Sequence, residues 1–294
     1  MFYRRKLILA LLEKLDERIE KNRLQKLIFL LTNKQKNPDY EFVPYHFGCY
    51  SYSLSADLKA MIKRKWVAIS DEGYGLKTEK KYYNELRSDD KIIVDGTISL
   101  YGKMNTEQIT KHTYFISPYH AINSTIARNI LPEKYYLRVQ DAKPKIDDTI
   151  LFTVGYEGIS LEEYLNKLIK NDVKLLIDVR KNPLSQKYGF SKKLLSGFCK
   201  KLNTDYLHIP EVGIDSSKRK ELNTQKDYDT LFEDYCKTVL EETKENQNYI
   251  LRLLKEKKRI ALTCFEAESC QCHRTHLAEK LKKSSTFKYK LKHI

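Results

Sequence analysis

Short apolar runs alternate with helical segments through the second half of the chain, and this alternation restricts the possible folds more than any other feature. The runs are ILFTV, KLLIDV, YLHI and RIALTC, beginning at residues 150, 174, 206 and 259. Strands that are apolar along their whole length are typical of a parallel sheet covered by helices on both faces. Ser160 and Glu163 form a capping-box pattern at the start of the first intervening helix. We therefore predict a three-layer, doubly wound, mostly parallel α/β domain.

The chain of 294 residues has room for two domains of ordinary size. The clearest boundary is AKPKIDD at residues 142–148, where a proline and mixed charges separate two hydrophobic patterns. We assign residues 149–294 to the α/β domain, residues 1–85 to a small helical and hairpin module, and residues 86–148 to a helical connector.

The first 85 residues contain the ingredients of a winged helix. Apolar spacing predicts helices at residues 5–21 and 23–32. A third helix is expected to begin with Ser53 or Ser55 as its cap and to run to Lys65, and residues 66–70 and 74–78 flank the turn-forming DEGYG as a hairpin. An apolar helix ending near Leu131 is expected within the connector.

Composition excludes several classes of protein. The six cysteines lack the regular spacing of a disulfide scaffold, so we expect free thiols and a cytoplasmic location. No stretch approaches the roughly 20 apolar residues of a membrane span, so we expect a soluble protein that does not enter membranes. Neither a P-loop, a Rossmann glycine fingerprint nor an HExxH motif is present, which argues against common NTPases, dinucleotide enzymes and zinc proteases. The sequence does not identify a cofactor or an oligomeric state.

A net charge of +15 favours polyanionic partners, so nucleic acid or a nucleotide is a possible partner. In a winged helix the third helix can enter the major groove of DNA. Here that helix carries four predicted nucleic-acid-binding residues, namely Lys59, Lys63, Arg64 and Lys65. The alternatives are that these side chains form a solvated face and that the hairpin contacts another protein.

Polar side chains stand at the ends of the predicted parallel strands. In such sheets the ligand crevice lies beyond the carboxyl ends of the strands, so these groups can converge. Three of them, Asp178, Cys264 and Glu266, are predicted to be catalytic, through proton transfer or nucleophilic attack. The predicted ligand-binding residues are Gly155, Tyr156, Arg180, Ser185, His208, Cys272, His273 and Arg274.

The stretch CFEAESCQCHRTHLAEKL opens the last helix near Cys272 and Arg274. A thiol at a helix N-terminus beside an arginine is expected to favour the reactive thiolate, and Arg274 can alternatively bind phosphate or carboxylate. Cys270 adds a C-x-C-H cluster whose ligand types suit zinc. The C-x2-C spacing of most structural zinc sites is absent, so the sequence assigns no metal ligand.

VGYEGISLEEYL, LIDVRKNPLSQKYGFSKKLL, YLHIPEVGI and TCFEAESCQCHRTHLAEKL together resemble the domain-of-unknown-function family 488 (DUF488), over residues 150–294. The resemblance implies the three-layer fold and a set of signature residues at strand ends, but no reaction. LQKLIFLL and YEFVPYHFGCYSYSLSADLKAMIKRKW resemble the winged-helix-like module found fused to that family, and more distantly the Panacea or SocA-like antitoxin domain.

Two hypotheses of function follow. The first is an enzyme that acts on a nucleotide or nucleic acid, with Arg180 and Arg274 holding phosphate. The fusion to a DNA-binding-like module suggests, by analogy, a role for this enzyme in DNA maintenance or defence. The second is a non-catalytic regulator whose first module binds DNA or protein and whose α/β domain senses a small anion. A structural alternative is that Asp178 with Arg180 or Arg274 is a buried ion pair that organises the strand ends.

Overall fold

The computed structural model describes residues 1–219, 222, 224–268 and 271–294. It consists of two compact units, Met1–Lys143 and Pro144–Ile294. The division between them falls inside the AKPKIDD segment. Among the described residues no helix is both long and apolar enough to cross a membrane.

The first unit begins with helices α1 (Tyr3–Leu15) and α2 (Lys21–Thr32). A hairpin of β1 (Val43–Tyr45) and β2 (Gly48–Tyr50) precedes α3 (Tyr52–Lys63), and a second hairpin of β3 (Val67–Ser70) and β4 (Gly73–Leu76) follows it. The remaining elements are η1 (Tyr83–Glu85), α4 (Ser88–Tyr101), α5 (Thr106–Ile116), η2 (Pro118–Ala121), α6 (Ala127–Ile130) and α7 (Glu133–Asp141).

Several predicted boundaries in this unit were wrong. The first helix ends at Leu15 because Asp16 adopts the left-handed conformation, which is a common way for a helix to stop. Ser51, not Ser53 or Ser55, caps α3, since its side chain accepts a hydrogen bond from the Leu54 amide. The apolar segment before Leu131 forms the short elements η2 and α6, not one helix.

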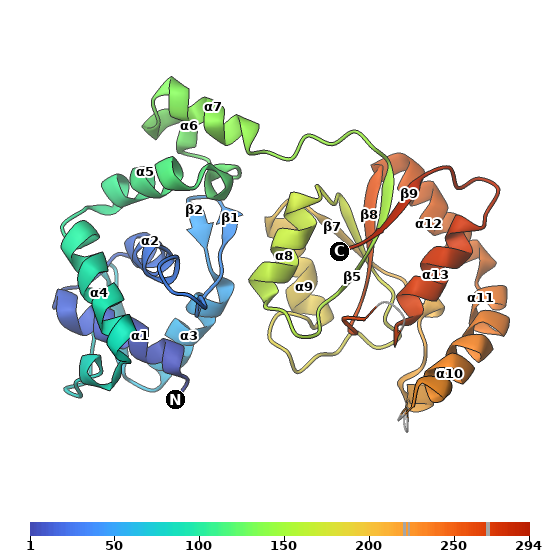
Figure 1. The fold of residues 1–294 in the computed structure, drawn as a ribbon, viewed down its shortest axis with the longest axis horizontal. Helices are drawn as coiled ribbons and strands as arrows, with labels where there is room; N and C mark the ends of the chain where they lie inside the picture. The colour runs from blue at the N-terminus through green and yellow to red at the C-terminus, as the bar shows by residue number, and fades with distance from the viewer. Residues whose placement is uncertain (220–221, 223, 269–270) are drawn as a thin grey trace. The chain divides into compact units, whose positions relative to one another are not determined.

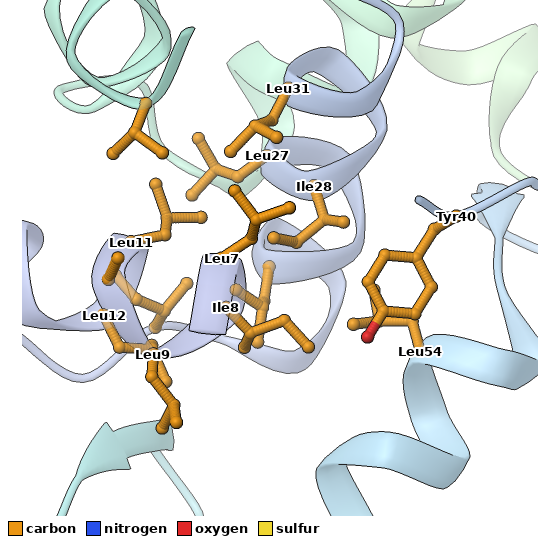
Figure 2. Close-up of a cluster of buried hydrophobic side chains, with 14 of the residues drawn as sticks. Leu7, Ile8, Leu9, Leu11, Leu12, Leu27, Ile28, Leu31, Tyr40 and Leu54 are labelled. Atoms are coloured by element: carbon orange, nitrogen blue, oxygen red, sulfur yellow. The ribbon is translucent and has the colours of Figure 1, made fainter. Parts of the chain in front are cut away.

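One buried core joins the helices of the first unit. Successive residues of α1, from Leu7 to Leu12, are all buried and pack against Leu27, Ile28 and Leu31 of α2, as Figure 2 shows. The same core includes Val94 of α4 and Ile109 of α5. The segment predicted as a connector therefore contributes to the core of the first 85 residues.

The second unit is built on a five-stranded parallel sheet, which confirms the predicted fold class. Its strands are β5 (Ile150–Gly155), β6 (Leu175–Asp178), β7 (Asp205–His208), β8 (Arg259–Cys264) and β9 (Lys290–His293), in the order β7-β6-β8-β5-β9. The last strand was not predicted.

Helices cover both faces of this sheet. Figure 1 shows α8 (Leu161–Lys170) and α9 (Lys192–Lys201) on one face, and α12 (Lys244–Lys257) and α13 (His273–Lys282) on the other, beside α10 (Gln225–Lys237) and α11 (Val239–Glu242). The short elements η3 (Pro210–Val212) and η4 (Ser216–Arg219) follow β7. Every residue of β5, β6 and β8 is buried, as their continuous apolar pattern requires.

Candidate active site

A cavity of about 300 Å³ lies at the carboxyl ends of β5, β6 and β8. Because β8 lies between β6 and β5 in the sheet, residues that follow these strands meet at one place. The cavity is lined by Tyr156, Arg180, Lys181, Asn182, Leu184, Ser185, Gln186, Ile214, Cys264, Phe265 and His273. Five of the residues predicted from the sequence thus line one cavity, namely Tyr156, Arg180, Ser185, Cys264 and His273.

Asp178 and Arg180 form a buried ion pair beside this cavity. Their side chains are 0% and 6% exposed, and Arg180 Nε donates to Asp178 Oδ1 over 2.8 Å. Arg180 Nη2 donates to the other carboxylate oxygen, which also accepts a hydrogen bond of 2.6 Å from the Tyr206 hydroxyl. Both oxygens of Asp178 are therefore occupied, and this geometry favours a positioning role over catalysis.

The Arg180 guanidinium also fixes Tyr156. Its Nη1 donates to the Tyr156 hydroxyl oxygen over 2.6 Å, and the Tyr156 ring stacks on Phe190 with centroids 4.1 Å apart. Burial opposes the Arg180 charge, but the hydrogen bonds and charge of Asp178 outweigh it and raise the pKa of Arg180. For Tyr156, burial disfavours the charged phenolate and therefore raises the pKa. The cavity wall thus presents a neutral phenol held by a permanent cation.

Cys264, the last residue of β8, places its sulfur between a carboxylate and an imidazole. Its Sγ lies 3.0 Å from Glu266 Oε2 and 3.6 Å from His273 Nδ1. His273 Nε2 lies 2.9 Å from the Val179 carbonyl oxygen, which can only accept, so Nε2 carries the proton. In a neutral imidazole Nδ1 is then an acceptor, and it faces the Cys264 thiol.

Cys272 lies next to this pair, at the N-cap of α13. Candidate ligand atoms of Cys264, Cys272 and His273 all lie within 4.8 Å of one another, and all three residues are buried. The expected thiolate at Cys272 is opposed by its surroundings, because burial raises the pKa of that thiol well above its ordinary value and outweighs the nearby Arg274 charge. Cys270, the other cysteine of the predicted cluster, lies outside the described residues.

Arg274 binds the protein's own backbone. Its Nη1 donates to the Glu266 carbonyl and its Nη2 donates to the Ala267 carbonyl over 3.1 Å. Gly155 allows this arrangement, since a Cβ there would lie 1.9 Å from the Glu266 carbonyl oxygen. Both residues position the chain after β8, so Arg274 is not oriented as a phosphate ligand.

His208 supports the site through the backbone of Arg180. Its Nε2 lies 2.9 Å from the Arg180 carbonyl oxygen, and its Nδ1 lies 3.0 Å from Lys192 Nζ. Sequence reasoning missed Tyr206, Phe190 and Lys187, whose Nζ donates to the Tyr156 carbonyl over 2.6 Å. Tyr206 had a usable signal, since it precedes His208 by two residues on the same strand and therefore shares its face.

The basic residues of the first unit are exposed around the end of α3. Lys59 and Lys63 are four residues apart on the helix, and Arg64 and Lys65 follow its last turn. The Arg64 guanidinium lies 5.1 Å from the centre of the Trp66 ring. The helix thus ends two residues earlier than predicted, and only two of the four basic residues lie on it.

Part of the chain matches a known family. Residues 160–281, less than half of the chain, match the family described as a domain of unknown function, DUF488. The match lies within the second unit and supports the resemblance seen there in the sequence. No curated protein matches the chain. The comparison therefore shows that residues 160–281 are similar to DUF488, and it indicates no activity.

Proposed function

We propose that the second unit is an enzyme that acts on a small anionic ligand of the nucleotide class, and that Cys264, Glu266 and His273 are its reactive groups. The observation that carries the proposal is the position of the Cys264 sulfur, which lines the cavity and lies within 3.6 Å of both a carboxylate and an imidazole. Two proton acceptors so close to one thiol are a common arrangement for activating sulfur.

The chemistry begins with the thiol proton. It passes from Cys264 Sγ to Glu266 Oε2 or to His273 Nδ1 and leaves a thiolate, which is the form of sulfur that attacks electrophiles and binds metals. The Val179 carbonyl keeps the other imidazole nitrogen protonated, so the ring stays oriented toward the sulfur. A thiol that lines a cavity and faces two proton acceptors favours a reactive role over a purely structural one.

Basic groups around the cavity favour an anionic ligand. Lys181 lines the cavity, and Lys187 is anchored on the Tyr156 carbonyl of its wall. A volume of about 300 Å³ is at the small end of the range for ligand pockets, which suits a mononucleotide or a smaller molecule. Nucleotides are therefore the first class to test.

A nucleotide panel tests this proposal on the full chain, with ligand binding measured as a rise in Tm and turnover by chromatography. Cys264→Ser and Glu266→Gln are expected to retain the fold and ligand binding and to lose turnover. Cys236→Ser, at a half-buried thiol on α10, is the control and should behave like the wild type. Binding without turnover in the wild type would instead favour the regulator hypothesis.

For the first unit we propose nucleic-acid binding by a winged-helix-like surface. The support is the exposure of Lys59, Lys63, Arg64 and Lys65 beside the β3–β4 hairpin.

For the location we propose the cytoplasm. Reactive cysteine chemistry suits a reducing compartment, and five cysteines in the described part of the chain are free thiols.

A further inference from the structure

Two sulfurs and an imidazole nitrogen converge at the wall of the cavity of the second unit. The candidate ligand atoms of Cys264, Cys272 and His273 lie within 4.8 Å of one another. Ligand atoms of a tetrahedral zinc ion are about 3.5–3.8 Å apart, given bonds of about 2.0–2.3 Å. The separation of 3.6 Å between Cys264 Sγ and His273 Nδ1 already fits that geometry. We infer that these three residues bind one Zn²⁺ ion.

The surroundings of His273 support this inference independently. Imidazoles that bind metals commonly donate their second ring N–H to a carbonyl or carboxylate, which fixes the tautomer and the ring orientation. His273 does so through Nε2, which donates to the Val179 carbonyl over 2.9 Å. The lone pair of Nδ1 is thereby left to face the Cys264 sulfur, 3.6 Å away.

Charge balance favours a divalent ion at this position. Zn²⁺ replaces the protons of the Cys264 and Cys272 thiols, and two thiolates with a neutral imidazole give a centre of zero net charge. Such a centre suits buried surroundings, where an isolated charge is costly. Two sulfurs and one nitrogen in tetrahedral geometry select zinc over harder ions such as Mg²⁺.

The fourth position of the ion faces the cavity. Cys264 and His273 line that cavity, whereas Cys272 lies behind them at the start of α13. Three protein ligands with one open position are typical of catalytic zinc. The inference rests on the proposed function, because the open position would receive water or an anionic group of the ligand. With Zn²⁺ on His273 Nδ1, Glu266, whose Oε2 lies 3.0 Å from Cys264 Sγ, would be the remaining proton acceptor of the reactive groups.

The test uses the full chain, reduced and stripped of metal, titrated with Zn²⁺ and with Co²⁺ as a spectroscopic probe. We expect one ion per chain and a cobalt spectrum with thiolate charge-transfer bands. Cys272→Ser and His273→Gln are expected to weaken binding by more than about 100-fold, beyond the effect of losing an outer hydrogen-bond partner. Cys236→Ser is the matched control and should bind like the wild type.

Zn²⁺ is also expected to protect Cys264 and Cys272 of the wild type from alkylation, as measured by mass spectrometry. This measurement uses only the wild type, so it holds even where a variant fails to fold. Failure of the wild type to bind one ion, or unchanged binding in Cys272→Ser, would overturn the zinc site. If the wild type turns over a nucleotide without bound metal and Cys264→Ser does not, the zinc site is overturned and the proposed enzyme is kept. Metal bound without nucleotide binding or turnover would keep the zinc site and remove the enzyme.

Discussion

Replacing Asp178 by Asn tests whether the buried ion pair supports the fold or serves the chemistry. The substitution preserves shape but removes the charge that Arg180 and Tyr206 contact, and both ion-pair side chains are at least 94% buried. Removing one partner of a buried pair commonly costs about 3–5 kcal/mol, because the other charge is left uncompensated. In a domain of about 150 residues each kcal/mol lowers Tm by about 2–4 °C. We therefore expect the second unit to melt about 6–20 °C lower.

Calorimetry on the full chain measures the transitions of both units. The single tryptophan, Trp66, lies in the first unit, so its fluorescence reports that unit and should be unchanged. Asp205→Asn is the matched control, since its ion pair with Lys257 is exposed and should contribute less than about 1 kcal/mol. A loss of less than 1 kcal/mol in Asp178→Asn would refute the structural role and return Asp178 to the candidate catalytic groups.

Three further predictions concern backbone space, buried thiols and charge. Gly155→Ala should destabilise the second unit and abolish ligand binding, because the added Cβ would overlap the Glu266 carbonyl. Gly197→Ala on α9 is the control for the same denaturation assay: its Cβ meets open space, so it should stabilise the unit by up to about 1 kcal/mol. Burial raises the pKa of Cys199 to about 12, so its contribution to stability is complete below the ordinary thiol value of 9.0 and is lost as pH rises from there to 12. Denaturation from pH 8 to 10 should therefore show a smaller loss of stability in Cys199→Ala than in the wild type, and equal losses would contradict this. Charge reversal at Lys63 and Arg64 should weaken duplex DNA binding and lower the slope of log affinity against log salt concentration by ~0.9 per lost phosphate contact. Charge reversal at the exposed Lys134 is the control and should change neither quantity. An unchanged slope in the Lys63 and Arg64 variant would exclude α3 as the interface.

The elements that the sequence predicted best are those whose residues share one environment. β5 and β8 are buried along their whole length, and Ser160 caps α8 by accepting from the Glu163 amide, so their local patterns agreed with the fold. β9 was missed because its KLKH sequence is lysine-rich and exposed, and only pairing with β5 makes it a strand. β1 was missed because Pro44 disfavours a strand.

The candidate site shows the same limit at the level of side chains. Strand ends placed Tyr156, Arg180 and Cys264 around one cavity, since topology alone brings them together. The direction of Arg274 was not predictable, because it depends on how closely the chain after β8 passes Gly155. The distinction between a side chain that lines a site and one that supports it is made by packing, which a single sequence does not contain.

β9 has a consequence for how the second unit avoids association. It pairs with β5 through four residues, and beyond it the Ile294 amide donates to the Thr153 carbonyl. Without this strand, β5 would expose a row of unpaired backbone groups along an apolar sequence, which is a template for sheet-to-sheet aggregation. Lys290 and Lys292 place charges along the outer border instead, where they repel another lysine-bearing edge. A short, charged strand thereby keeps the strand beside Cys264 from becoming a surface on which copies of the protein could polymerise.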